Sequence, residues 1–205
     1  MAIEVVSVAA GNEDANERDN GTAFSFDALS MNISANASAG SRWNSGAIFH
    51  TSIPQGAVIN TAHLEAYFAT ATSDDVDGAG ACEDVDTPDD YETTQDVTSR
   101  TITSASAAML AADIGTGRQT IPQSLHAPIQ EVVDRPGFSG SINLIVRGAA
   151  APDAGTDEGC VTRCVDGFAE PWELTIDYDA GDAGPLDIER RCPRGVARGI
   201  ARGVV

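Results

Sequence analysis

The residues that could carry out acid–base or nucleophilic chemistry are few and scattered in this sequence. The three histidines, His50, His63 and His126, lie far apart, and the chain contains neither a G-x-S-x-G nucleophile elbow nor an H-E-x-x-H metal motif. If His50 and His63 lie on adjacent strands, we expect a surface pair rather than a catalytic one. The 31 acidic residues are too widely spread to single out a glycosidase-type carboxylate pair. The sequence therefore predicts a protein that is not an enzyme.

A structural Ca²⁺ ion is the first candidate ligand. Asp74, Asp75 and Asp77 supply hard oxygen ligands at the start of an acidic segment, residues 73–96, and Ca²⁺ takes about 6–8 such oxygens. Further carboxylates follow in this segment and in a later one: Glu83, Asp84, Asp86, Asp153, Asp157 and Glu158. The spacing does not complete an EF-hand, so a solvated acidic loop without metal stays open as the alternative.

The four cysteines are too few to form a disulfide scaffold in a chain of this size. Cys160 and Cys164 are close enough in sequence for a disulfide within one hairpin, and either of them could instead pair with Cys82. Free thiols and a zinc site remain alternatives, although a C-x-x-x-C spacing without a second matching pair is weak evidence for zinc.

Composition and charge exclude two broad classes of protein. The chain has 205 residues and a net charge of -19, and a surface this acidic repels the phosphates of nucleic acids. No apolar run approaches the roughly 20 residues of a membrane span. The first residues, Met1–Val6, lack the basic and apolar regions of a secretory signal, so we expect release by cell lysis rather than by general export.

The last sixteen residues differ in charge from the rest of the chain. Every acidic residue lies at or before Glu189, and five of the twelve arginines follow it, so residues 1–189 carry -24 and residues 190–205 carry +5. We therefore predict an acidic domain over 1–189 and an anchoring tail over 190–205. The tail repeats R-G-x-x three times and is similar to the R-G-rich C-terminal tails of some phage tail proteins.

A helical tail would place its arginines in one row and its aliphatic residues in another, namely Arg194, Arg198 and Arg202 beside Val196 and Ile200. Its three glycines disfavour a free helix. We expect the tail to become ordered by docking on an acidic partner, the alternative being a disordered tail without a partner.

The pattern of apolar residues predicts short strands and one helix. We expect strands over 3–8, 22–27, 46–51, 58–70, 97–106, 141–146 and 172–178, with a bulge near Thr61 and a tight turn over 53–57. A helix over 124–134, capped by Ser124, would bury Leu125, Ile129, Val132 and Val133. Weaker helical spacing covers 106–114, and loops are expected over 12–21, 32–45, 73–96 and 149–167. These elements predict an all-β sandwich with one short helix.

Three segments resemble the DNRLRE-type β-sandwich domains of bacterial surface proteins and phage virion proteins. They are the turn and strand over 53–67, preceded by Trp43, the helix over 128–138 (P-I-Q-E-V-V-D-R-P-G-F), and the final strand over 172–178 (W-E-L-T-I-D-Y). The resemblance implies a jelly-roll β-sandwich similar to carbohydrate-binding modules, in a family without common catalytic residues. Trp43, Tyr67, Tyr91 and Phe138 are the aromatic candidates for a sugar platform, although Trp43 and Phe138 are better explained as core residues.

Together, these features predict a non-enzymatic structural protein of a bacteriophage virion, in the distal tail or another displayed appendage, assembled in the host cytoplasm. Its expected partners are other virion proteins, further copies of itself and a glycan of the host surface. Two alternatives stay open: a capsid decoration protein and a bacterial carbohydrate-binding module.

Overall fold

The computed structural model describes residues 1–18, 24–25, 30–36, 41–69, 76–92, 97–111, 115–148, 157–163 and 170–181. In chain order the elements are β1 (Ala2–Ser7), η1 (Gly11–Glu13), β2 (Asp14–Arg18), β3 (Phe24–Ser25), β4 (Ser30–Asn36), β5 (Ser41–His50), β6 (Val58–Phe68), β7 (Val76–Cys82), β8 (Ala107–Ala111), β9 (Gly117–Thr120), α1 (His126–Val133), β10 (Ser141–Gly148), β11 (Asp157–Arg163) and β12 (Glu173–Asp179). The predicted all-β class with one short helix is confirmed, and the predicted tail over 190–205 lies outside the described residues.

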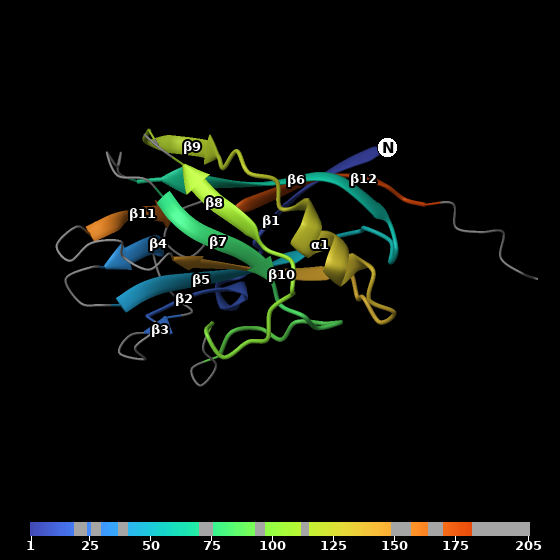
Figure 1. Ribbon diagram of the computed structural model, residues 1–205, viewed down its shortest axis with the longest axis horizontal. Helices are drawn as coiled ribbons and strands as arrows, with labels where there is room; N and C mark the ends of the chain where they lie inside the picture. The colour runs from blue at the N-terminus through green and yellow to red at the C-terminus, as the bar shows by residue number, and fades with distance from the viewer. Residues whose placement is uncertain are drawn as a thin grey trace, which may run out of the picture.

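The strands pack as two antiparallel layers with α1 at one end (Figure 1). One layer has the order β1-β12-β6-β11, with β9 paired to β6; the other has the order β5-β10-β7-β8, with β2 also paired to β5 and β3 to β2. β4 pairs with both β11 and β5, so hydrogen bonding continues from one layer to the other. Strands β5, β6 and β7 alternate between the layers, as do β9, β10 and β11, which gives the crossovers of a jelly roll.

The main core fills the space between the layers. Phe49 and Leu144 enter it from one layer and Leu64 and Ile176 from the other, while Ile129 closes it from α1. A second, smaller cluster lies on the outer face of β5 and β10, and it contains Ala15, Ile48, Tyr91, Val97 and Ile145. β5 and β10 are therefore buried on both faces, because the chain between β7 and β8, with Tyr91 and Val97, covers their outer side.

The turn and bulge predicted around β6 are confirmed. Gly56 has φ 74°, a conformation that favours glycine, and the Ala57 amide donates to the Pro54 carbonyl at 3.1 Å. Asp177 of β12 lies opposite Thr61, and Tyr178 lies opposite Ile59. Asn60 is thus the extra residue of a β-bulge, which lets this strand of eleven residues twist around the core.

The helix was predicted correctly in place and in buried face. Ile129, Val132 and Val133 are buried, Pro128 lies in the first turn, and the helix ends at Val133, before the Arg135-Pro136-Gly137 stop. The expected cap was wrong, because the N-cap residue is Leu125 and it makes no side-chain cap bond. Ser124 instead accepts a hydrogen bond from the Ala62 amide of β6 at 3.3 Å, and a second from the His126 amide at 3.4 Å.

Several irregular predictions were wrong because strand pairing outweighed local sequence preference. Residues 14–18, 32–36 and 41–45, which were expected in loops, belong to β2, β4 and β5, and the acidic segment contains the strand β7. Residues 107–111 form β8 rather than a helix, because they pair with β7. The strand expected over 97–106 is an irregular segment with a single bridge between Glu83 and Ile102. The first strand, expected to be buried, is an edge strand with exposed side chains.

Candidate functional site

The structure describes only part of the sites that the sequence predicted. Arg194, Val196, Arg198, Ile200 and Arg202 of the tail lie outside the described residues, as do Asp74, Asp75 and Cys164. Asp77 is placed by its backbone in β7, opposite Leu110, and Cys160 by its backbone in β11, opposite Ile33. The calcium and disulfide predictions therefore stay predictions. Within the described residues there is no group of three or more His, Cys, Asp or Glu side chains that could hold a metal ion.

Cys82 is a free thiol, so its alternative pairing with Cys160 or Cys164 was wrong. It lies at the end of β7, fully buried in the main core. Burial, together with the nearby charge of Glu131, raises the pKa of this thiol well above its usual range. Cys82 is consequently a core residue rather than a reactive one.

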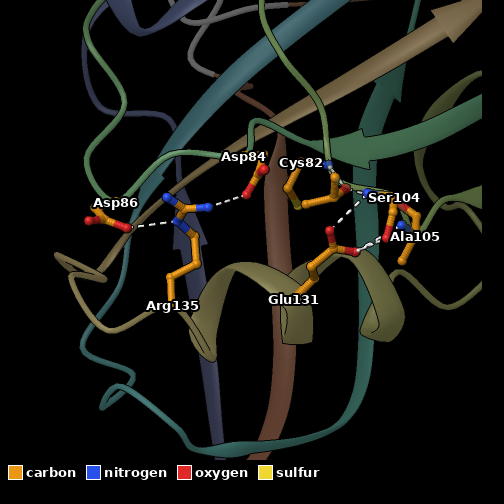
Figure 2. A network of polar contacts seen from close by, with 8 residues as sticks. Cys82, Asp84, Asp86, Ser104, Ala105, Glu131 and Arg135 are labelled. Carbon is orange, nitrogen blue, oxygen red and sulfur yellow. Dashed lines mark hydrogen bonds and ion pairs between the residues drawn. The ribbon is translucent and has the colours of Figure 1, made fainter.

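Polar side chains hold the chain between β7 and β8 to the helix and to the sheet. Helix α1 holds one side of this segment through Glu131, as Figure 2 shows. The Glu131 carboxylate accepts hydrogen bonds from the Ser104 and Ala105 amides at 2.8 Å each and from the Ser104 hydroxyl at 3.0 Å. The hydrogen bonds donated by the Ala105 and Ser104 amides lower the pKa of Glu131, because they stabilise the charged carboxylate.

Arg135, just after α1, holds the other side of the same segment (Figure 2). Its Nε donates to Asp86 Oδ1 at 2.7 Å, and a second guanidinium nitrogen pairs with Asp84. These two carboxylates raise the pKa of Arg135. A Cβ at Gly137 would overlap the Asp86 carboxylate, so the glycine lets this carboxylate lie close to the end of the helix. The helix end and the acidic segment therefore fit together closely.

A buried polar network fastens the segment to the sheet beneath it. Arg100, whose side chain is 4% exposed, donates to Glu83 Oε2 at 2.6 Å, and its guanidinium stacks 4.1 Å from the centre of the Tyr91 ring. Asn143 of β10 closes the circuit: its Nδ2 donates to Glu83 Oε2 and its Oδ1 accepts from the Tyr91 hydroxyl, both at 2.8 Å. Because the Arg100 charge is paired with Glu83, and Asn143 hydrogen-bonds to both Glu83 and Tyr91, this charged network is compatible with burial.

The polar strand β2 belongs to the same arrangement. Glu17 is buried, and its carboxylate accepts hydrogen bonds from the Thr98 amide at 2.9 Å and the Thr98 hydroxyl at 3.3 Å. The Asn12 backbone carbonyl accepts a hydrogen bond from the Tyr91 amide at 2.8 Å, and the Asn12 side chain donates one to Asp90 at 2.7 Å. Residues expected to form a solvated turn thus act as partners of the folded acidic segment.

The structure also brings together a Ser–His–Glu group that the sequence gave no reason to expect. His50 Nδ1 lies 2.9 Å from Ser141 Oγ, and His50 Nε2 lies 2.8 Å from Glu13 Oε1. The other Glu13 oxygen accepts the Ala9 and Ala10 amides at 2.9 and 3.0 Å. The expected pairing of His50 with His63 was wrong, because β5 and β6 lie in different layers and His63 lies opposite Thr175.

Three side chains of this kind do not by themselves make a site for acyl transfer. Such a reaction requires hydrogen-bond donors aimed at the developing oxyanion. Next to Ser141 the backbone instead presents the Gly140 carbonyl, which accepts from the Thr51 amide at 2.6 Å and from its hydroxyl at 2.9 Å. We therefore interpret Ser141, His50 and Glu13 as a polar link between β10, β5 and η1.

Most of the aromatic candidates for a sugar platform are buried or packed against other side chains. Tyr91 is 1% exposed and was wrongly considered a surface residue. Phe138 packs against the main core, and Trp43 is half-buried with Arg18 stacked 4.7 Å from its ring. Close to Tyr91 the surface has an open depression of about 380 Å³, lined by Pro88, Asp89, Asp90 and Glu92. The described residues that line it offer carboxylates and no aromatic ring to a ligand.

Comparison of the sequence with models of protein families and with curated proteins finds no match. Among the described residues, no helix is long and apolar enough to cross a membrane. Charged and polar side chains hold the described part of the chain between β7 and β8 against the sandwich. Two residues of the acidic segment were a signal for this network. Arg100 is the only arginine or lysine between positions 43 and 117, and Tyr91 is the only Phe, Trp or Tyr between positions 69 and 137.

Proposed function

We propose that this chain is a non-enzymatic structural protein of a tailed-bacteriophage virion, located in the distal tail or another externally displayed appendage. The sandwich is the displayed module, and the basic segment over 190–205 attaches it to other virion proteins through Arg194, Arg198 and Arg202. Ca²⁺ in the segment around Asp74, Asp75 and Asp77 remains part of the proposal as a structural ion.

The observation that carries the proposal is that the three segments resembling DNRLRE-type domains contact one another directly. Gln130 of the helix motif accepts from the Ile59 amide at 2.7 Å and donates to the Ala57 carbonyl at 2.8 Å, both in the turn-and-strand motif. The Gly56 amide also donates to the Val133 carbonyl at 2.9 Å. The third motif, β12, pairs along β6. Residues in these motifs thus act together as a scaffold, which supports a display domain of that type.

The contacts that hold the chain between β7 and β8 support the same proposal. A module exposed outside a particle benefits from connections that resist local opening, and such opening depends on how many contacts hold a segment. The segment between β7 and β8 is held by Glu131, Arg135 and the buried Arg100–Glu83 pair. The same segment carries acidic side chains outward, including Asp89 and Glu92.

The proposal is tested by locating the chain in purified particles. Particles released by lysis of cells that carry the gene are labelled with gold-conjugated antibody against this chain and viewed by electron microscopy. Label at the tail tip or another appendage is the expected result, and label across the capsid would favour the decoration protein instead. Particles without the chain, combined with saturable glycan binding by the purified protein, would contradict a virion role and favour the carbohydrate-binding module.

A charge variant tests the anchoring role of the tail. Replacing Arg194, Arg198 and Arg202 by Gln is expected to abolish incorporation into particles while leaving the sandwich folded. The control variant R18Q removes a positive charge from the body of the chain and should be incorporated normally. Equal incorporation of all three proteins would rule out the tail as the anchor.

A further inference from the structure

The exposed apolar side chains of the described residues gather on one face of one layer. Four large hydrophobic residues are exposed there: Met1, Ile3, Val5 and Val58. Ile3 and Val5 alternate with residues that point inward along β1, and they are 70% and 59% exposed. Val58, at the start of β6, lies opposite Asp179 and is 54% exposed. A set of exposed apolar residues on one face marks a site of interaction.

Carboxylates of β12 and β6 share this face. Ile3 lies opposite Asp177, which lies opposite Thr61, and in the last row Ser7, Glu173 and Glu65 are neighbours. Asp177 accepts a long hydrogen bond from Asn60 at 3.4 Å, and Glu173 pairs with Arg118 at 3.0 Å. The face therefore combines aliphatic side chains with an excess of negative charge.

The strand that carries Ile3 and Val5 also has a free edge. β1 is the terminal strand of the described pairing order and is hydrogen-bonded to β12 on one side. No described strand pairs with its other side. Edge strands of this kind add a further strand readily, since the main chain supplies the hydrogen bonds and alternate side chains supply the specificity.

The basic tail has the complementary pattern when it is extended. With a period of two, one face of the strand carries alternating arginine and aliphatic residues, and the other carries mostly glycine and alanine. The first set is Arg194, Val196, Arg198, Ile200, Arg202 and Val204; the second is Gly195, Ala197, Gly199, Ala201 and Gly203. The tail carries +5 and the rest of the chain -24, so the charges attract as well.

We propose that the segment over 194–205 binds in the same molecule as an extended strand along the free edge of β1, with its arginine and aliphatic side chains beside Ile3 and Val5. β12 ends at Asp179, beside the start of β1 (Figure 1). Residues 182–193 can span up to about 40 Å, whereas the edge lies only about 10 Å, two strand spacings, away. So short a connection gives the tail a high effective concentration at this edge. The proposal concerns the free chain and does not rest on the proposed function.

Hydrogen exchange of the full-length protein tests this proposal. The variant V196S/I200S/V204S keeps the length and charge of the tail but removes its aliphatic side chains. We expect amides of residues 2–7 to exchange about tenfold faster in this variant than in the unchanged protein, with β10 unaffected. A matched pair of charge variants follows: R198Q/R202Q should also speed exchange in β1, whereas R190Q/R191Q, outside the segment, should not.

A second measurement approaches the same contact from the other side. Trypsin cleaves after arginine, so a docked tail should be protected at Arg194, Arg198 and Arg202. We expect I3S/V5S, which changes exposed positions and leaves the core intact, to be cleaved there about tenfold faster than the unchanged protein. Equal cleavage together with equal exchange in β1 would overturn the proposal. If protection of the tail from trypsin rose with protein concentration and dimers appeared in sedimentation velocity, the tail would bind to a second copy of the chain. That result would overturn the proposal of binding within one molecule.

Discussion

The Tyr91 side chain lies directly over Gly46, so closely that a Cβ at Gly46 would overlap the tyrosine hydroxyl and lie 2.6 Å from Cζ. Gly46 is in the middle of β5, and Tyr91 belongs to the acidic segment that crosses the outer face of this strand. The missing side chain therefore makes room for an aromatic ring that is itself bound to Asn143 and Arg100. This contact determines how closely the segment can approach the sheet.

Replacing Gly46 by Ala should destabilise the protein by about 3 kcal/mol, because the new methyl group has no space beside the buried ring. The free energy of unfolding in urea measures the effect. Gly115→Ala is the matched control: Gly115 is exposed, and an added Cβ would lie 3.8 Å from Gln119 Nε2, an ordinary contact distance, so a change within about 0.5 kcal/mol is expected. Equal free energies of unfolding for the two variants would show that Tyr91 does not lie in close contact with Gly46.

Replacing Arg100 by Met should cost about 3 kcal/mol or more. The substitution keeps an apolar stem but leaves Glu83 as a buried carboxylate without its cation, and removing one partner of a buried pair is costly. Arg42→Met, at an exposed arginine of β5, should cost less than about 1 kcal/mol. A second change, Glu83→Gln, should recover part of the loss in the Arg100→Met background. Additive losses would show that the two side chains do not depend on each other.

The sequence predicted best the elements whose burial is apolar and periodic. In β6, alternation of Leu64, Ala66 and Phe68 placed the strand and its inner face correctly, and spacing of Ile129 and Val133 did the same for α1. These patterns are local, so they are visible without knowing the partner. The bulge at Asn60 could be predicted to within one residue, because a strand of this length must bend or twist to stay on a small core.

The missed elements are those whose burial depends on distant partners. Glu17 in β2 is buried because Thr98, far along the chain, donates to it, and nothing in the local sequence reveals this. In β8 the run Ala107–Ala111 has helix-forming residues, but pairing with β7 decides its structure. The polar network was missed for the same reason, because its members Glu83, Arg100 and Asn143 lie far apart in the sequence.

The Cys82 thiol should be inert in the folded protein. Only a thiolate reacts rapidly with iodoacetamide, and burial both raises the pKa of this thiol and shields it from the reagent. At pH 8 we expect alkylation of Cys82 to be at least about a hundredfold slower in buffer than in denaturing urea, measured by mass spectrometry of its tryptic peptide. Similar rates in the two solutions would contradict the buried position at the end of β7.

The pairing of Glu131 with the Ser104 and Ala105 amides should make stability depend on pH. These bonds hold the pKa of the folded carboxyl below its value in the unfolded chain. The unfolded state therefore binds the proton more readily. The stability that these hydrogen bonds contribute is complete above the unfolded pKa of about 4.3 and is lost as pH falls through the folded pKa.

Glu131→Gln, which keeps the shape but not the charge, should lower stability by about 1 kcal/mol at pH 7. Urea unfolding at pH 7 and at pH 3 measures the change: the gap between the variant and the unchanged protein should narrow at the lower pH. Glu92→Gln, at the exposed edge of the segment, should show no gap at either pH. A gap for Glu131→Gln that stayed constant with pH would mean that its carboxylate charge does not hold the segment to α1.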